Sequence, residues 1–282
     1  VKYLQHSIFN LNDVPFDQSF FTSLRLKYGS PTVLLSGFTG AGPYPQCYYS
    51  TDDISLKNEV KSVQSQYIDK SIIINKILDP KVFIPFAGQY LLGCSNSKLN
   101  HFRSVYDAAE LYDHLPNCIV LKDYSGSIDI QSLKTAHPRL TQYDPTDVQE
   151  RIDTISKQLF DYEYLDIDYL ISGSRFTKLL SNALFNSYSR STNDSDYLVI
   201  FAIEDKYYGV NYNTNLSFKL LTFNSSDQIP EPYSIFYLDK RLLFGLVVGL
   251  YHWNNIEVGS LFRCTRRPSN LYNSLVHDAL NF

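Results

Sequence analysis

An acidic side chain follows a short apolar segment near the start of the chain. Ser7–Leu11 is the apolar segment, and Asn12 and Asp13 come directly after it. A carboxylate at the end of a strand is well placed to bind a metal ion, although an Asp in this position more often caps a helix or forms a turn. Asp13 is therefore a candidate metal ligand that needs support from other residues.

A glycine-rich segment after the next expected strand is the second candidate. Gly37–Tyr48 reads Gly-Phe-Thr-Gly-Ala-Gly-Pro-Tyr-Pro-Gln-Cys-Tyr. Glycine permits positive φ and a close approach of the backbone, which suits a ligand-facing loop at the carboxyl end of a strand. The segment has no Gly-Lys-Ser/Thr and lacks the spacing of a dinucleotide-binding loop, so we do not expect it to hold a phosphate chain. A tight structural loop packed by its own tyrosines is the alternative.

The other metal-ligating residue types form no local site. A zinc site needs three or four ligands that converge on one point, usually with short characteristic spacings. The histidines show no H-x-H, H-x-x-E-H or H-E-x-x-H pattern; they are His6, His101, His114, His137, His252 and His277. The cysteines are scattered, without a C-x-x-C pair; they are Cys47, Cys94, Cys118 and Cys264. With no visible signal peptide, we expect a reducing cytoplasm.

Polar side chains also cluster towards the end of the chain. The segment His252–Ser260 follows an apolar run, contains the only Trp, and offers these residues for a ligand pocket: His252, Trp253, Asn254, Asn255 and Glu257. Buried amides that fix a helix-to-strand corner explain the segment equally well. The arginines 263, 266 and 267 either bind an anion or lie at the surface. The acidic and aromatic run 161–168 is better explained as a solvated helix junction.

The composition excludes several classes of protein. The net charge is −4, from 25 Lys and Arg against 29 Asp and Glu, which argues against nucleic-acid binding because that needs a cationic surplus. The longest apolar run, Leu242–Tyr251, is half of the roughly 20 residues that a membrane helix requires. We therefore expect a soluble globular protein with no membrane span. The sequence has no Met and begins with Val1, so it is either a processed or internal fragment or a sequence that lacks modified methionines.

The expected elements change character near residue 140. Before it, strands at 7–11, 32–35 and 82–84 alternate with helices at 17–28 and 51–76, an order that favours an α/β layered fold. After it, short strands follow at fairly even spacing, at 197–202, 207–211, 217–221 and 234–238. Helices are expected at about 144–160, 168–188, 241–251 and 270–279. We therefore predict an α/β domain over 1–140 and an α+β module over 141–282.

Four motifs together resemble one branch of the metallo-β-lactamase-fold superfamily. They are Asn10-Leu11-Asn12-Asp13, Gly37–Tyr48, Ile84-Pro85-Phe86-Ala87-Gly88 and His252–Ser260. The branch includes relatives of the CMP-N-acetylneuraminate and UDP-N-acetylmuramate hydroxylases, and the resemblance covers nearly the whole chain. It implies the second half of a metallo-β-lactamase-type αβ/βα sandwich in the first domain. It also implies an appended sterol-carrier-like α+β module in the second.

The resemblance further implies a metal site at the edge of the sandwich. By position, Asp13 is the family's bridging Asp, and the pocket is shaped by Thr39, Gly40, Tyr44, Gln46, Tyr48, Phe86 and Gly88. The H-x-H-x-D-H motif of the family's first half is absent, and Ile84–Gly88 has no His where the family has its last ligand. In these relatives the domain accompanies a Rieske iron–sulfur domain, but the Rieske ligand pairs C-x-H and C-x-x-H are absent from this sequence. One Asp cannot hold a metal ion alone.

We therefore expect the C-terminal part of a metal-dependent enzyme, hydrolytic or oxygenase-linked, completed by an N-terminal half or by another polypeptide. Zinc, iron or manganese is the expected metal in the complete protein, and a small molecule is the expected substrate. An open half-sandwich exposes strand edges and an apolar face, so an obligate complex is expected. Two alternatives stay open: a non-catalytic accessory or scaffold subunit, and a module that binds lipid or another hydrophobic ligand.

Overall fold

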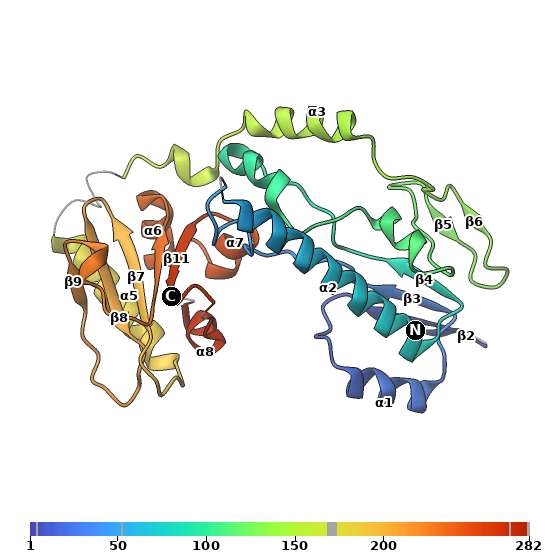
Figure 1. Ribbon diagram of the computed structural model, residues 1–282, viewed down its shortest axis with the longest axis horizontal. Coiled ribbons are helices and arrows are strands. Elements are labelled where there is room, and N and C mark those ends of the chain that lie inside the picture. The colour runs from blue at the N-terminus through green and yellow to red at the C-terminus, as the bar shows by residue number, and fades with distance from the viewer. Residues whose placement is uncertain (4, 52, 168–173, 271, 281–282) are drawn as a thin grey trace. The chain divides into compact units, whose positions relative to one another are not determined.

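Two larger sheets, each with its own helices, and one two-stranded sheet organise the described part of the chain in the computed structural model (Figure 1). The structure describes residues 1–3, 5–51, 53–167, 174–270 and 272–280. The expected mixture of α and β structure is confirmed. Unit 1 comprises Val1–Ala41, Lys57–Leu91 and Phe102–Asp153, and unit 2 comprises Gly42–Leu56, Leu92–His101 and Thr154–Phe282. The division thus falls at 153/154 rather than 140/141, and two early segments belong to unit 2.

Unit 1 is built on a sheet of four strands in the order β1-β2-β3-β4. These are β1 (Lys2–Tyr3), β2 (His6–Leu11), β3 (Val33–Ser36) and β4 (Val82–Pro85). β2, β3 and β4 are parallel, and β1 is antiparallel to β2. The helices α1 (Gln18–Tyr28) and α2 (Ile54–Leu78) connect successive parallel strands. All five elements from β2 to β4 were predicted from the sequence, with boundaries within a few residues.

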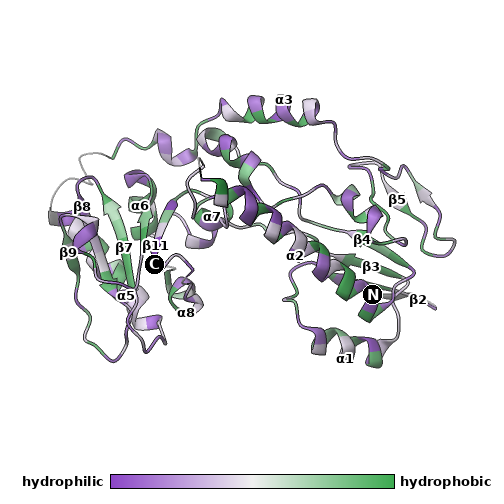
Figure 2. Cartoon of the chain, in the orientation of Figure 1, coloured by the Kyte–Doolittle hydropathy of each residue, from purple (hydrophilic) through white to green (hydrophobic). Residues whose placement is uncertain are grey.

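Both faces of this sheet are covered, because successive side chains of a strand point to opposite faces. Leu34 and Phe83 pack with Phe21 of α1 and Leu78 of α2 in one cluster. On the other face, β3 and β4 pack against partly buried aliphatic side chains from residues 119–133. Strands that are buried on both faces have continuous apolar sequences. β3 and β4 have such sequences, and both are mainly green in Figure 2.

Local signals fix the ends of the unit 1 helices. The Asp17 carboxylate accepts hydrogen bonds from the backbone N–H groups of Ser19 and Phe20 and so caps α1. Gly29 ends α1 at φ 79°, a backbone conformation that glycine adopts without strain. The other elements assigned before residue 157 are η1 (Cys94–Phe102), η2 (Ala108–Asp113), β5 (Ser127–Ile128), β6 (Thr135–Ala136) and α3 (Pro145–Ser156). Between β4 and β5, Cys118 forms an isolated bridge to Phe83, and Leu121 forms one to Pro138.

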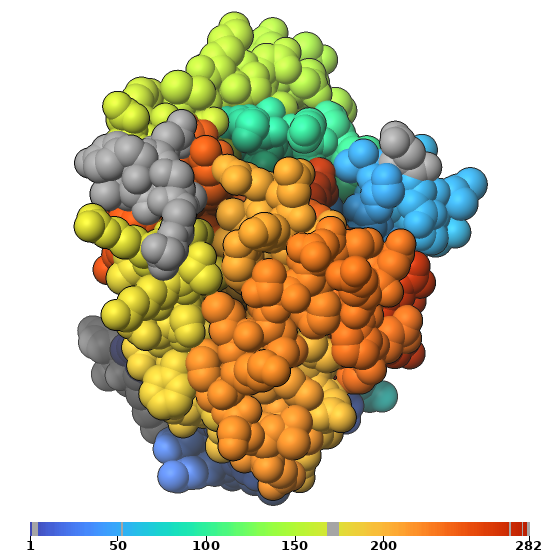
Figure 3. All heavy atoms as spheres, turned by 90° about the vertical axis from the view of Figure 1, so that its left-hand side faces the viewer, coloured from blue at the N-terminus to red at the C-terminus, as the bar shows by residue number. Residues whose placement is uncertain are grey.

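Unit 2 is built on a five-stranded mixed sheet in the order β11-β10-β7-β8-β9. Its strands are β7 (Leu198–Ile203), β8 (Lys206–Asn211), β9 (Leu221–Phe223), β10 (Tyr233–Tyr237) and β11 (Arg263–Arg267). Its helices include η3 (Asp161–Tyr164), α5 (Ser174–Arg190), η4 (Ser226–Gln228), α6 (Lys240–Val247), α7 (Trp253–Val258), α8 (Ser274–His277) and η5 (Asp278–Leu280). α5 lies against β8 and α6, and in Figure 3 the yellow atoms of the α5 region border the orange atoms of the residues that follow it.

Unit 2 differs from expectation at three places. The helix predicted over 241–251 ends at Val247, and a separate helix, α7, begins at Trp253. β11 was not predicted. A strand was expected at 217–221, but β9 begins only at Leu221. The first six residues of the helix expected at 168–188 lie outside the described residues. Within the described part of the chain, no helix has both the length and the apolar character needed to cross a membrane.

Candidate functional site

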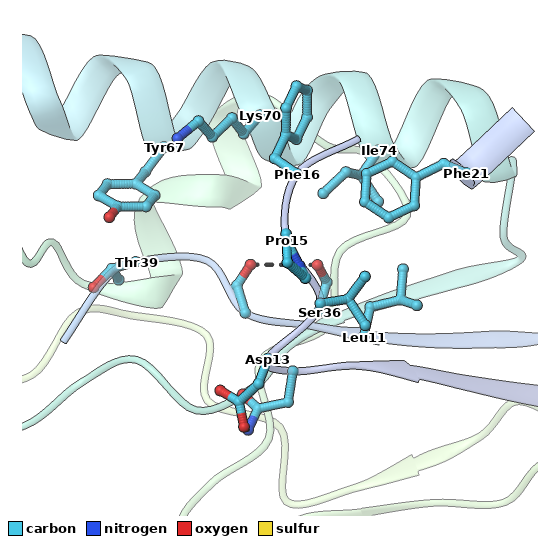
Figure 4. A pocket seen from close by; sticks show the side chains of 13 residues that line it. Leu11, Asp13, Pro15, Phe16, Phe21, Ser36, Thr39, Tyr67, Lys70 and Ile74 are labelled. Atoms are coloured by element: carbon cyan, nitrogen blue, oxygen red, sulfur yellow. Dashed lines mark hydrogen bonds between the residues drawn. The ribbon is translucent and has the colours of Figure 1, made fainter. Parts of the chain in front are cut away.

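A pocket opens at the carboxyl ends of β2 and β3 in unit 1 (Figure 4). We call it the carboxyl-edge pocket. It encloses about 240 Å³ and is lined by Leu11, Asn12, Asp13, Val14, Pro15, Phe16, Phe21, Ser36, Gly37, Thr39, Tyr67, Lys70 and Ile74. Open α/β sheets commonly bind ligands outside the carboxyl ends of their strands. The position agrees with what the sequence indicated for Asp13 and for the start of the glycine-rich segment.

The register of the parallel strands brings these residues together. Leu11 is paired with Ser36, and Ser36 with Pro85. The residues that follow each strand, Asn12 and Asp13 after β2 and Gly37 to Thr39 after β3, therefore emerge at the same edge. The opposite wall comes from α2, where Tyr67, Lys70 and Ile74 are spaced by three and four residues and so share one face of the helix.

Contacts from α2 and from two other segments of unit 1 fix the loop after β3. The Thr39 hydroxyl donates to the Gly88 carbonyl oxygen at 3.2 Å, and the buried Tyr106 hydroxyl donates to the Phe38 carbonyl oxygen at 2.8 Å. A Cβ atom on Gly40 would lie 2.0 Å from the Tyr67 hydroxyl, so a larger residue here would require this ring to move. Burial raises the pKa of Tyr67, so this phenol remains protonated and can donate a hydrogen bond. The loop is held in place before any ligand arrives.

Asp13 and Lys70 are the ionisable groups with opposite charges in the pocket lining. Asp13 is exposed, and the Asn12 side-chain amide donates to its Oδ2 at 3.2 Å. In Figure 4, Asp13 lies beyond the strand ends on the side away from α2, whereas Lys70 extends along α2 towards Tyr67. Of the two charged groups, Lys70 is therefore the one beside the cavity wall formed by α2.

The predicted substrate-contacting residues divide between the two units. Thr39 and Gly88 lie together, Gly40 packs on Tyr67, and Phe86 is exposed on the loop after β4. Only Thr39 of the seven lines the carboxyl-edge pocket. Tyr44, Gln46 and Tyr48 belong to unit 2. The glycine-rich segment is thus shared by both units, and its sequence gave no sign of the division after Ala41.

In unit 2, the second half of this segment packs on β11 and the turn before it. The Gln46 side-chain amide is fully buried and donates to the Gly42 carbonyl oxygen and to the Ser260 hydroxyl, the latter at 2.9 Å. The Arg266 guanidinium lies 4.4 Å from the centroid of the Tyr48 ring and 5.7 Å from that of Tyr44. These contacts are what a loop packed by its own tyrosines would make.

The polar segment 252–257 forms helix α7, and its side chains do not converge. His252 is exposed and caps the helix, because its Nδ1 accepts from the Asn254 backbone N–H. Asn254 and Asn255 are exposed, so the interpretation as buried amides was wrong. Trp253 is fully buried in the core. Glu257 faces the buried His277, with 3.6 Å between the carboxylate Oε1 and the imidazole Nδ1.

The wall supplied by α2 was missed at the level of sequence. The helix itself was expected at 51–76, but Lys70 was not singled out. The i, i+3, i+7 spacing of Tyr67, Lys70 and Ile74 marks one face of the helix. The spacing does not show which part of the sheet this helix face lies over, because that position depends on how α2 connects β3 to β4.

Comparison with known proteins adds no relative. No protein family model matches the chain, and neither a curated protein nor a solved structure matches it. The resemblance to the metallo-β-lactamase-fold branch stays a prediction.

Proposed function

We propose that unit 1 carries a small-molecule binding site of an enzyme, located in the carboxyl-edge pocket. The observation that carries this proposal is the cavity itself, which lies at the carboxyl edge of a parallel sheet and has Thr39 and Lys70 in its lining. Ligand sites are typically concave and mostly apolar, with a few polar groups that orient the ligand. A cavity of about 240 Å³ suits a ligand smaller than a typical drug molecule.

Binding of small polar fragments tests this proposal. In TROSY NMR spectra of the full chain, fragments that bind should shift the backbone signals of Asp13, Gly37 and Thr39 together. A Thr39→Trp variant fills the pocket and should abolish these shifts. Phe86→Ala is the matched control, because Phe86 lies after the neighbouring strand but does not line the pocket. Shifts that are scattered over the surface, or that survive Thr39→Trp, would contradict the proposal.

The metal that the resemblance implies does not fit the described residues alone. Among them, no group of three or more His, Cys, Asp or Glu side chains is arranged to hold a metal ion. Asp13 offers one carboxylate, of which Oδ2 accepts from Asn12. A single carboxylate cannot complete the three or four ligands that a catalytic zinc needs. We derive no catalytic step through a metal from this chain.

As a second candidate, we propose that Asp13 supplies one ligand to a zinc, iron or manganese site completed by another polypeptide or by an N-terminal half of the sandwich. Its exposure at the strand end supports this. The natively purified assembly should then contain about one or two metal ions per copy, and Asp13→Asn should remove most of the metal. Elemental analysis measures this, with Asp17→Asn, a helix cap, as the control. Equal metal in the Asp13→Asn and parent proteins would exclude Asp13 as a ligand.

The remaining proposals have less support. A scaffold role, in which the sheet edge binds a partner without chemistry, predicts that Asp13→Asn leaves the activity of any assembly unchanged. A lipid-binding role for unit 2 finds no support in its centre, where Trp253 packs against Phe201, Phe236 and Phe262. We also propose a cytoplasmic location, which the four free, buried cysteines allow.

A further inference from the structure

Lys70 is a half-buried cation in the wall of the carboxyl-edge pocket. Its ammonium nitrogen lies 4.9 Å from the centroid of the Tyr67 ring and 6.0 Å from that of Phe16. Within the described residues, no carboxylate lies within ion-pair distance of this nitrogen. The two rings attract the ammonium by cation–π interaction, but they do not neutralise its charge.

This arrangement favours an anion. A cation that is partly removed from water and has no counter-charge gains more from an incoming anion than an exposed lysine does, because its charge is less well screened. The ligand therefore places its negative group at Lys70, which lies in the wall formed by α2 (Figure 4).

The apolar lining beside Lys70 defines the rest of the ligand. Phe16, Phe21 and Ile74 line the pocket beside Tyr67. A ring or a short apolar body packed on these side chains buries area that contributes to binding. A free inorganic ion would leave this surface unoccupied.

We propose that the carboxyl-edge pocket binds a small molecule that carries a carboxylate or a phosphate on a compact apolar or ring-shaped body, with Lys70 as the anion-binding residue. This inference rests on the proposed small-molecule site and names its ligand class. Carboxylate and phosphate share the chemistry that Lys70 recognises, which is a negatively charged oxygen.

Three probes and three variants test the inference on the full chain. The probes are phenyl phosphate, benzoate and uncharged benzyl alcohol, and binding is followed by the NMR signals of Gly37 and Thr39. The two anions should bind the parent protein with dissociation constants of about 1 mM, as expected for ligands of this size. Lys70→Gln should weaken both by about tenfold or more, since a charge-assisted hydrogen bond is lost. Lys70→Arg keeps the charge and should retain much of the affinity.

Lys61→Gln is the matched control, because Lys61 is an exposed lysine on the same helix. It should leave every affinity unchanged. If phenyl phosphate and benzoate bind with different affinities, the tighter one identifies the preferred negative group. If they bind equally, the site recognises the negative charge and does not distinguish phosphate from carboxylate. If benzyl alcohol binds as tightly as the anions, or if Lys70→Gln has no effect, the anion inference fails while the small-molecule site stands. If no probe shifts the signals of Gly37 and Thr39, both proposals fail.

Discussion

Replacing Trp253 by Ala should lower the free energy of unfolding by about 3–5 kcal/mol, the cost of removing a large aromatic side chain from a packed core. The indole is fully buried, stacks on Phe262 at 5.6 Å between ring centroids, and meets Phe236 edge-to-face at 5.1 Å. Urea unfolding followed by far-UV circular dichroism measures the loss. The chain has a single Trp, so fluorescence cannot compare the two proteins.

Asn254→Ala is the control for this prediction. Asn254 is the next residue on α7, and its side chain is exposed. Its replacement should change the free energy of unfolding by no more than about 0.5 kcal/mol. If Trp253→Ala costs less than about 1 kcal/mol, the segment 252–257 is not a structural element of unit 2. The alternative of a ligand pocket there would then need to be tested.

A buried ion pair in unit 1 gives the second large effect. Arg139 Nη1 donates to both carboxylate oxygens of Asp107, at 2.8 and 3.0 Å, and both side chains are nearly buried. The Asp107 carboxylate also accepts hydrogen bonds from the backbone N–H groups of Ala109 and Tyr143. The first of these bonds caps η2. Asp107→Ala should therefore cost about 3 kcal/mol, because it leaves a buried guanidinium without its counter-charge. The control is Asp113→Asn, an exposed acid at the end of η2, which should have no measurable effect.

This contribution should depend on pH. Burial by itself raises the pKa of Asp107, but the hydrogen bonds from Ala109, Tyr143 and Arg139 outweigh it and hold the pKa below its ordinary value. A carboxylate with a lowered pKa in the folded state stabilises the protein fully above its unfolded pKa of about 4 and loses this effect as the pH falls through the folded pKa. The difference in stability between the parent and Asp107→Asn should be largest near pH 6 and shrink below pH 4. A constant difference would contradict the role of the charge.

The sheet of unit 1 could be predicted because its signals are local. Short apolar runs bounded by Gly, Pro and Asp define β3 and β4, and Asp17 marks the start of α1. The rule that ligands bind at the carboxyl ends of parallel strands then singles out Asp13 and the glycine-rich segment that begins at Gly37. No comparable local signal places Lys70, since its position in the pocket depends on how α2 packs over the sheet.

Several elements of unit 2 lack such local signals. β11 reads Arg-Cys-Thr-Arg-Arg and resembles a surface segment rather than a strand. It pairs with β10 at one edge of the sheet, where only Cys264 is buried and the arginines remain accessible, as is common for edge strands. Trp253 stands among polar neighbours for a similar reason, because a short helix buries one face and exposes the others. Sequence alone does not tell which of these side chains turns inward.

The most direct test of the carboxyl-edge pocket is a crystal structure of the protein soaked with phenyl phosphate. We predict that the phosphate lies within about 3 Å of the Lys70 Nζ, the distance of a charge-assisted hydrogen bond. The phenyl ring should pack against Tyr67 and Phe16. Phenyl phosphate bound instead at the arginines of β11, with only water in the carboxyl-edge pocket, would contradict the account.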